Sequence, residues 1–403
     1  MNQVKLSREI GTALLLFYGL GNILGAGIYV LVGKVAGIAG YYSVFSFFVA
    51  CVIAVFTAFS YMELASRYPV SAGAAVYIKE GLGSKKLSLS FGLMIAAAGL
   101  VSAATMAHGF AGYLSQFVPI NKELSMLLLI VVLVGISISS IKVSVLLASV
   151  ITIIEIIGLL IIIYYGFDKV LNPSISFKEF IPEFSVSDMS IVFLGSFLAF
   201  YAFLGFEDMV NIAEEVKNPS RAFPIAISLA LAISTLLYIL IVIVALEVLS
   251  IEELQSSGAP FSDIYTRLTG KEAFLISVIA TLAVVNGGLI QIIMASRIIY
   301  GMSSKGWLPS FFSKVSMKTK TPVNATLFVG LVTIIFAFLF DIVALASYTS
   351  MLILIIFTLV NVSLIRIKFR STVTEDIVQV PAWVPWVGMS LNLLLIGMKL
   401  FSS

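Results

Sequence analysis

The stretch GLGNILGAGIYV, from Gly19 to Val30, lies within a long apolar segment yet carries residues that weaken helices. Glycine occupies four of the nine positions 19 to 27, and each glycine costs about 1 kcal/mol of helix propensity relative to alanine. Two interpretations follow. Gly21 and Gly25 have the small-xxx-small spacing that lets another helix pack closely, or the segment is a broken membrane helix that lines a binding site. A Rossmann loop fits poorly, since the spacing differs and no strand precedes it.

The composition indicates a membrane protein. Hydrophobic residues make up 60% of the 403 residues and charged residues only 11%, with a mean hydropathy of +1.11, whereas an ordinary soluble domain is about half apolar. The single cysteine, Cys51, excludes an intramolecular disulfide and a cysteine metal site. We expect a lipid bilayer around the protein, and no cofactor, metal or nucleic-acid partner.

Apolar segments of about 20 residues, the length of one helical span, predict eleven membrane-spanning helices. They cover residues 10–33, 42–65, 88–117, 124–141, 144–166, 189–214, 223–248, 273–301, 323–340, 342–366 and 381–400. The first span is too long for a cleavable signal segment, so we expect it to remain in the mature protein. The predicted fold class is an all-α polytopic membrane protein.

Lysine and arginine residues in the loops predict the orientation. If the N-terminus is cytoplasmic, 17 of the 24 lysine and arginine residues lie on the inner side and 7 on the outer side. The positive-inside rule therefore places the N-terminus in the cytoplasm. Eleven crossings then place the C-terminus outside, and we expect the plasma membrane as the location.

A second interruption lies in the sixth predicted span, within FYAFLGFEDMVNIAEEV from Phe200 to Val216. Gly205 stands among aromatic residues, and the acids Glu207 and Asp208 that follow are costly at that depth unless they face protein or water. The two breaks lie five spans apart, and a repeat of five crossings enters the membrane in the opposite sense from its copy. We therefore predict inverted repeats at residues 1–166 and 189–366, followed by an additional helix at 381–400.

Two broken helices offer the groups that bind a zwitterion. Where the first helix restarts near Gly25, the N–H groups of residues 26–28 have no helical partners and carry the positive end of a helix dipole, which suits a carboxylate. Where the half-helices before Ile23 and before Gly205 end, free carbonyl groups suit an ammonium group. An α-amino acid carries both groups on one carbon, so the predicted substrate is an amino acid.

Four segments resemble the signature segments of the amino acid, polyamine and organocation transporter superfamily. They are GAGIY at Gly25–Tyr29, YMELASRYPVSAGA at Tyr61–Ala74, FLGFED at Phe203–Asp208 and EEVKNPSRAFP at Glu214–Pro224. The resemblance extends from about Leu6 to Lys399. It implies the leucine-transporter-type fold, a five-plus-five inverted repeat with broken helices 1 and 6, and a transporter that works by alternating access.

The resemblance also implies a substrate site at the two breaks. By position, Ile23, Ala26 and Gly27 match the substrate-holding residues of the first span, and Tyr201, Ala202 and Leu204 match those of the sixth. Gly25 and Gly205, the break positions themselves, complete the predicted site. Tyr201 lies where many relatives place an aromatic lid.

The fifth predicted span departs from the family pattern. Many proton-coupled or sodium-independent relatives carry a lysine in the middle of this span, whereas VITIIEIIGLL from Val150 to Leu160 has Glu155. A carboxyl group at mid-membrane is either neutral and hydrogen-bonded or charged and paired. We expect Glu155 to couple a proton; the alternative is a structural bridge, for example to Asn286 at similar depth. Glu207 is the rival proton carrier or gating residue, or it ties its half-helix to a neighbour.

These features favour proton-coupled uptake of neutral amino acids. Glu155 and Glu207 are available as proton carriers, and the eighth span lacks an obvious Ser/Thr pair for sodium near Asn286. An exchanger is the runner-up, and a polyamine or cationic amino acid carrier is the alternative for the substrate. A channel is the rival of a different class, but no repeated selectivity-filter loop is visible. The sequence has no motif of a hydrolase, metalloprotease or nucleotide-binding enzyme, so we predict no catalytic residue.

The connection from Ser250 to Lys271 is long for a loop between two spans. Ser250 and Glu253 form a capping-box pattern, which predicts the start of a short helix. The connection is a candidate lid over the outer side, and an ordinary surface loop is the alternative.

Overall fold

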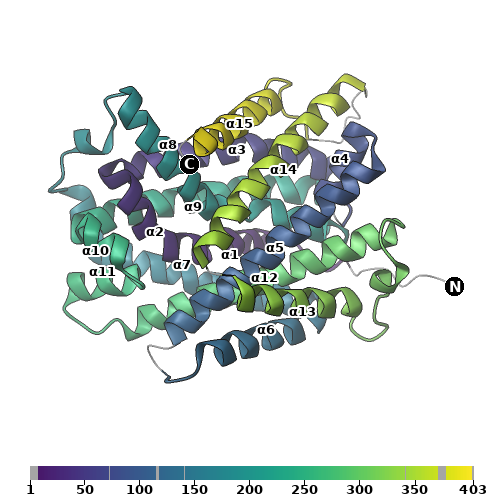
Figure 1. Ribbon diagram of the computed structural model, residues 1–403, viewed down its shortest axis with the longest axis horizontal. Coiled ribbons are helices and arrows are strands. Elements are labelled where there is room, and N and C mark those ends of the chain that lie inside the picture. Colours follow the sequence, from purple (N-terminus) through teal and green to yellow (C-terminus); the bar gives the residue numbers. More distant parts are fainter. Residues whose placement is uncertain are drawn as a thin grey trace.

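The computed structural model describes residues 8–71, 73–114, 118–139, 141–340, 342–370 and 378–401. Within these residues the chain is helical almost throughout (Figure 1), with one isolated backbone bridge between Ile10 and Val216. Predicted span residues 115–117 and 140 lie outside the described residues, and so does the side chain of Ala26.

The helices follow one another along the chain with 3-10 helices, labelled η, between them. In order they are α1 (Thr12–Leu24), α2 (Ala26–Ala39), η1 (Gly40–Tyr42), α3 (Ser43–Arg67), α4 (Gly73–Leu82), α5 (Lys85–Leu114), α6 (Lys122–Ile138), α7 (Ile141–Leu171), η2 (Phe177–Phe180), α8 (Val186–Phe200), η3 (Tyr201–Phe203), η4 (Phe206–Glu215), α9 (Pro219–Val248), α10 (Ile251–Ser256), α11 (Pro260–Thr269), α12 (Phe274–Ser304), η5 (Ser310–Ser313), α13 (Val323–Leu339), α14 (Ile342–Arg370) and α15 (Val384–Phe401).

Nine helical segments of the described residues are long and apolar enough to cross a membrane. The chain is therefore a multi-pass helical membrane protein. Every predicted span overlaps helical residues, but the spans at α6 and α13 correspond to helices of only 17 residues each. The total of eleven crossings and the inverted repeat stay predictions. Helix α4, with 10 residues, is not among the predicted spans.

Two helices are interrupted where the sequence predicts. Helix α1 ends at Leu24 and α2 begins at Ala26, with Gly25 between them in a non-helical conformation (φ −47°, ψ −141°). Helix α8 ends at Phe200, and η3 and η4 lie on either side of Gly205, whose φ is +128°. Residues with a side chain rarely adopt that φ, so the second break requires glycine. The chain after this break continues as a 3-10 helix rather than an α-helix.

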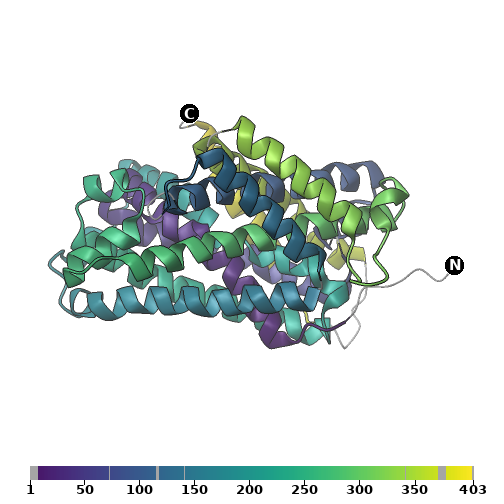
Figure 2. The same cartoon turned by 90° about the horizontal axis from the view of Figure 1, so that it is seen from below.

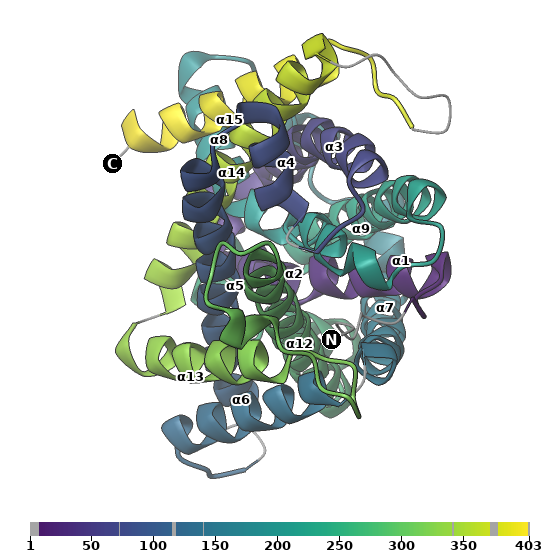
Figure 3. The ribbon, with the colours of Figure 1, turned by 90° about the vertical axis from the view of Figure 1, so that its right-hand side faces the viewer.

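The broken segments lie inside the helix assembly. Helix α1 packs against α9 and α7, α5 lies along α12, and α3 contacts both α8 and α9 (Figure 3). Helices α6 and α13 lie side by side on one flank, next to α5 and α12. The long helices α7 and α12 contact each other and run along the molecule together in Figure 2. Helix α4 lies near the N-terminal end of the molecule, and α10 and α11 lie at the opposite end (Figure 1).

Candidate functional site

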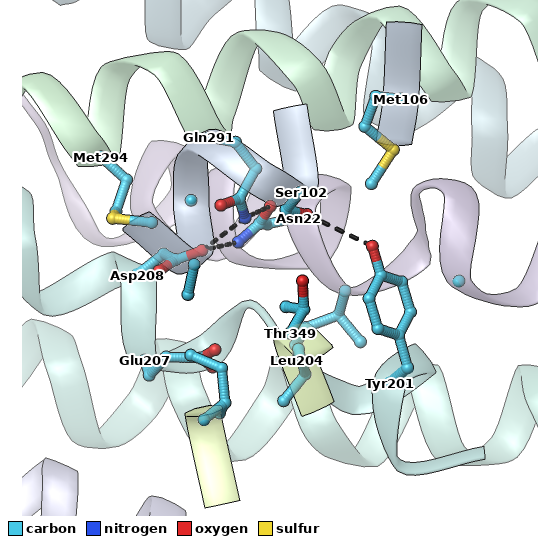
Figure 4. A pocket seen from close by; sticks show the side chains of 15 residues that line it. Asn22, Ser102, Met106, Tyr201, Leu204, Glu207, Asp208, Gln291, Met294 and Thr349 are labelled. Carbon is cyan, nitrogen blue, oxygen red and sulfur yellow. Dashed lines mark hydrogen bonds between the residues drawn. The ribbon is translucent and has the colours of Figure 1, made fainter. Parts of the chain in front are cut away.

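A cavity lies where the two broken helices meet (Figure 4). Its volume is about 30 Å³, which is room for one or two water molecules and well below the roughly 300–1,000 Å³ of small-ligand sites, so binding of a larger ligand requires the walls to move apart. Its walls come from α1, α2, the η3–η4 segment, α5, α12 and α14. The cavity is thus built from segments distant in the sequence and centred on the predicted breaks.

Both breaks contribute predicted site residues to the lining. The predicted residues that line the cavity are Ile23, Gly27, Tyr201, Leu204 and Glu207. The predicted positions outside the lining are Gly25, Ala26, Ala202, Gly205, Glu155 and Asn286. Of these, the first four form the breaks themselves, whereas the last two lie on α7 and α12, behind the first break.

Three polar side chains form a hydrogen-bonded triad on the cavity wall (Figure 4). Asp208 Oδ2 accepts hydrogen bonds from Asn22 Nδ2 at 2.5 Å and from Gln291 Nε2 at 2.7 Å. Gln291 Nε2 also donates to Asn22 Oδ1 at 3.0 Å. The triad joins the last turn of α1 to η4 and α12, and all three side chains are buried. The predicted site lacks all three residues, although a glutamine and an aspartate inside apolar spans are themselves a sequence signal.

The Tyr238 hydroxyl of α9 lies between the two breaks. It is within hydrogen-bonding distance of the Ile23 carbonyl oxygen, and it lies 2.9 Å from the Ala202 carbonyl oxygen. The Gly205 carbonyl oxygen accepts a hydrogen bond from Asn22 Nδ2 at 3.2 Å. The Gly205 carbonyl group and one of the Ile23 and Ala202 carbonyl groups are therefore not free, since the single Tyr238 hydroxyl proton serves one carbonyl oxygen at a time. Side chains of the protein reach them, since an unpaired buried carbonyl group is costly.

The two breaks touch each other at Gly27. A Cβ atom at Gly27 would lie 2.6 Å from Ala202 Cα, so the start of α2 packs directly on η3. Gly205 is crowded in the same way, because a Cβ atom there would lie 2.8 Å from Asn22 Nδ2. The missing side chains at both glycines let the two backbones approach closely.

Glu155 and Asn286 form a buried pair beside the first break. Asn286 Nδ2 donates to Glu155 Oε1 at 2.8 Å and to Thr152 Oγ1 at 3.0 Å. This contact joins α7 to α12, as the bridging alternative describes. Glu155 Oε2 has no hydrogen-bond partner among the described residues. The pair supports α1 from behind, because a side chain at Gly21 would run into Thr152 and Asn286.

The rest of the lining is mainly apolar. Met106, Met294 and Ile353 contribute to it from α5, α12 and α14. The Tyr201 hydroxyl lies 3.3 Å from Ser102 Oγ of α5, which holds the tyrosine across the cavity (Figure 4). The sequence does not identify these apolar wall residues. In a membrane span, an apolar residue that faces a cavity looks the same in sequence as one that packs against another helix.

Helices α10 and α11 cover the end of the molecule opposite the N-terminus. The predicted capping box is formed, since Ser250 Oγ accepts from the Glu253 N–H and Glu253 Oε2 accepts from the Ser250 N–H. Arg267 Nη2 lies 2.7 Å from Glu253 Oε1. The Ser250 N–H, with the Arg267 guanidinium, holds the pKa of the Glu253 carboxyl group below its usual range. Helix α10 lies on α2, where Lys34 Nζ donates to the Gln255 carbonyl oxygen at 2.5 Å.

A buried ion pair joins η4 to α12 at the N-terminal end of the molecule. Arg297 Nη2 lies 3.5 Å from Glu215 Oε1, and both side chains are 0% exposed. The Glu215 carbonyl oxygen accepts hydrogen bonds from the N–H groups of Glu9 and Ile10 at 3.0 Å each. The Ile10 carbonyl oxygen accepts from the Lys217 N–H at 2.8 Å. These backbone hydrogen bonds therefore hold the N-terminal segment beside the ion pair.

Comparison with known families decides what kind of protein carries this cavity. Residues 10–403 match the family described as amino acid permease. The chain belongs to this family. The match confirms the resemblance to the amino acid, polyamine and organocation transporters, and it makes this chain a member of a transporter family.

The proteins similar to this chain are named for different substrates. Cationic amino acid transporter 3, mitochondrial, of Arabidopsis thaliana is 26% identical over 397 residues, which cover 94% of this chain and 65% of that protein. The branched-chain amino acid permease BcaP of Bacillus subtilis is 26% identical over 390 residues, 91% of this chain and 82% of that protein. The methylthioribose transporter of Bacillus subtilis is 28% identical over 399 residues, 94% of this chain and 85% of that protein. The chain spans 65% of the mitochondrial cationic amino acid transporter 3 and 60% of the vacuolar cationic amino acid transporter 2 of Arabidopsis thaliana, less than two thirds of each.

Proposed function

We propose that this chain is a secondary active transporter that moves amino acids across the plasma membrane by alternating access. The observation that carries the proposal is the cavity between the two helix breaks, inside a multi-pass helical protein. Transporter sites form where discontinuous helices meet, because the interrupted ends expose backbone groups that bind charged ligands. Rocking or gating of one set of helices against the rest would open this cavity to each side in turn.

The start of α2 is the proposed site for the substrate carboxylate. Helix α2 begins at Ala26 and has no side-chain cap at Gly25, so its first N–H groups lack helical partners and carry the positive end of the helix dipole. Gly27 in the first turn of α2 lines the cavity. The proposed substrate-binding residues are Ile23, Gly25, Ala26, Gly27, Tyr201, Ala202, Leu204 and Gly205.

We propose neutral amino acids as the substrate class. The support is the apolar part of the lining, in which Met106, Met294, Leu204 and Ile353 offer surface to an aliphatic or aromatic side chain. Apolar walls with a few placed polar groups are typical of sites that recognise such ligands by shape. The relative named as a branched-chain amino acid permease is consistent with this choice.

A carrier of cationic amino acids or polyamines is the second candidate. Glu207 and Asp208 both line the cavity, and the described lining residues include no lysine or arginine. If one carboxylate binds the α-ammonium group, the other remains to bind a second ammonium group on the substrate. The Arabidopsis relatives are named as cationic amino acid transporters.

A coupling proton is the proposed source of energy, with Glu155 as its carrier and Asn286 as its hydrogen-bond partner. Glu155 is fully buried, and its Oε2 has no partner among the described residues. A charged carboxylate with an unpaired buried oxygen is costly, so the neutral acid suits this conformation. Glu207, whose Oε2 accepts the Gly205 N–H at 2.8 Å, is the second candidate for the proton or for gating. Exchange against an internal amino acid is the runner-up mechanism, and sodium coupling is less favoured.

The proposed arrangement in the membrane has the N-terminus in the cytoplasm and the C-terminus outside. It is supported by the 17 of 24 basic residues that this orientation places inside. The two breaks, at Gly25 and Gly205, support inverted repeats at 1–166 and 189–366 with an additional helix at 381–400. In this orientation α10 and α11 form a lid on the outer side.

Uptake by proteoliposomes tests the proposal. The purified chain is reconstituted and supplied with the twenty labelled L-amino acids, with and without an inward proton gradient. We expect one or a few neutral amino acids to accumulate only with the gradient, and unlabelled lysine and spermidine not to compete. Competition by lysine or spermidine would favour the cationic carrier. Uptake only after a second amino acid is loaded inside would make the chain an exchanger, and unsaturable flux would make it a channel.

A further inference from the structure

We infer that Asp208 binds the ammonium group on the α carbon of the substrate, in place of the free carbonyl groups that broken transporter helices offer. The inference rests on the proposed function and names one more residue of that site. Three observations carry it: protein donors already reach three carbonyl groups at the breaks, the Asp208 carboxylate is held on the cavity wall, and the described lining residues include no lysine or arginine.

The carbonyl groups nearest to both breaks have partners within the protein. The Ile23 and Ala202 carbonyl oxygens lie within hydrogen-bonding distance of the Tyr238 hydroxyl, and the Gly205 carbonyl oxygen accepts from Asn22 Nδ2. An ammonium group would compete with these donors for the carbonyl oxygens. A carboxylate is the stronger partner for an ammonium group, because two opposite full charges attract each other more strongly than a charge attracts a neutral carbonyl group.

Asp208 is positioned to serve as that partner. Its Oδ2 is fixed by two amide donors, Asn22 Nδ2 at 2.5 Å and Gln291 Nε2 at 2.7 Å (Figure 4). Its Oδ1 has no hydrogen bond from any described residue, the residue is only 2% exposed, and it lines the cavity. Two donors on one oxygen hold the carboxylate in a single orientation, and this leaves the other oxygen for a ligand.

The charge of the described lining favours a cation. Glu207 and Asp208 are both in the lining, whereas the described lining residues carry no lysine or arginine. A buried carboxylate without a compensating positive charge is costly, and a substrate ammonium group would supply the compensation. Of the two acids, Glu207 already accepts the Gly205 N–H through Oε2, whereas amide side chains from α1 and α12 hold Asp208.

Asp208 and the proposed carboxylate site lie on the walls of the same cavity. Asn22, which donates to Asp208, lies in the last turn of α1, and Gly27 lies in the first turn of α2, on the other side of the Gly25 break. Asn22, Gly27 and Asp208 all line the one cavity. In the inferred pose, an α-amino acid bound by its carboxylate at the start of α2 turns its ammonium group toward the triad.

Binding of matched ligands to the purified full chain tests the inference. The twenty L-amino acids are screened by calorimetry at fixed pH, and the tightest binder is then compared with its 2-hydroxy acid, which lacks the ammonium group. We expect the wild type to bind the hydroxy acid at least about 30-fold more weakly, the loss that follows from removing one member of a buried charge pair. Asp208→Asn keeps an oxygen for the two amide donors but loses the charge.

Asp208→Asn is expected to weaken amino acid binding by about 30-fold or more and to change hydroxy acid binding by less than about threefold. The matched control is Asp168→Asn, the same change at an exposed end of α7, which should bind like the wild type. Glu207→Gln is measured alongside, and a larger loss of discrimination there than in Asp208→Asn would overturn the assignment.

The outcomes separate the inference from the proposed function. Amino acid binding by the wild type, with equal affinity in Asp208→Asn, would overturn the inference and leave the function standing. Binding of none of the twenty amino acids would overturn both. If Asp208→Asn does not fold, the wild-type comparison decides: equal affinity for the amino acid and its hydroxy acid overturns the inference, and the expected difference supports an ammonium site.

Discussion

The Glu155 carboxyl group belongs to a hydrogen-bonded pair that supports helix α1. Its Oε1 accepts from Asn286, its Oε2 has no partner among the described residues, and the Asn286 amide lies directly behind Gly21 of α1. Gaining or losing a proton changes which hydrogen bonds this pair can make. Such changes have a large effect on the hydrogen-bond energies because the dielectric constant of the protein interior is low. The broken helix that lines the cavity therefore rests on a group whose charge can change.

Replacing Glu155 with glutamine isolates that charge. Glu155→Gln keeps an oxygen that accepts from Asn286 but has no ionisable proton. We expect amino acid binding within about threefold of the wild type, loss of proton-driven accumulation, and retained exchange of labelled for unlabelled substrate. Proteoliposome uptake measures all three, and Glu179→Gln, an exposed glutamate in η2, is the matched control. Full gradient-driven accumulation by Glu155→Gln would remove Glu155 from the coupling mechanism.

Gly205 is the residue on which the second break depends. Alanine there would have to adopt φ +128° and place a Cβ atom 2.8 Å from Asn22 Nδ2. We expect Gly205→Ala to lower the free energy of unfolding by about 1–3 kcal/mol, the usual cost of one strained backbone conformation, and to disturb the triad. Denaturant titration in detergent measures the change. Gly397→Ala, at a helical position where a Cβ atom has nothing within 4 Å, should cost nothing.

At the scale of elements, α10 is too short to be stable by itself, since isolated helices need about 12–15 residues. It has 6 residues, and its order comes from the capping box and from docking on α2. The docking face of α2 is formed by Gly33 and Gly37. A Cβ atom at Gly33 would overlap the Leu254 carbonyl group, and one at Gly37 would lie 2.5 Å from Gln255 Cγ. Helix α10 therefore lies close against α2, through the backbone of Leu254 at Gly33 and through the side chain of Gln255 at Gly37.

Filling the docking face should release the lid. In Gly33→Ala the added methyl group overlaps the Leu254 carbonyl group, so α10 has to move away from α2. We expect faster hydrogen exchange at residues 251–256 with little change in α12. Mass-spectrometric exchange measures this, again with Gly397→Ala as control. Unchanged protection of α10 in Gly33→Ala would show that the cap alone orders it.

The lid also has a predictable pH dependence. The pKa of Glu253 is lowered, first by the Ser250 N–H and then by Arg267, so the capped form favours the charged carboxylate. Its contribution is present above the ordinary glutamate pKa of about 4.3 and is lost as the pH falls through the lowered value. A spin label at Glu252→Cys in a Cys51→Ser background should become more mobile over that range. Mobility independent of pH would contradict this, and Glu253→Gln should remove the dependence.

At the scale of the whole molecule, the sequence predicts those features that depend on the local residue pattern and on depth in the membrane. Apolar length places the helices, the cluster of glycines around Gly25 marks the first break, and Gly205 marks the second because its positive φ and the close Asn22 side chain both favour glycine. The partners of those breaks are not predictable in this way. Tyr238 and Gln291 reach them from α9 and α12, and only the packing of distant helices brings them there. The Glu155–Asn286 contact could be anticipated because both polar groups lie at similar depth.

The buried Arg297–Glu215 pair ties η4 to α12 across the molecule and should show the cost of an unpaired charge. Arg297→Met leaves Glu215 buried without its partner, so we expect a loss of about 3–5 kcal/mol in the free energy of unfolding. Arg297→Met combined with Glu215→Gln should regain most of it. The exposed Glu253–Arg267 pair is the control, since Arg267→Met should cost less than about 1 kcal/mol. Equal losses in the single and double variants would contradict this account.

The bridge between Ile10 and Val216 uses main-chain atoms only: the N–H groups of Glu9 and Ile10 bond to the Glu215 carbonyl group, and the Lys217 N–H bonds to the Ile10 carbonyl group. These bonds require only an N–H group at Glu9, Ile10 and Lys217, which every residue except proline supplies. Two homologues could therefore differ at these three positions and still share the bridge, so a comparison of residues would score the segment as variable. Superposition of the backbones would reveal that the bridge is preserved. Residue identities at these positions can therefore change during evolution while the backbone contact stays the same.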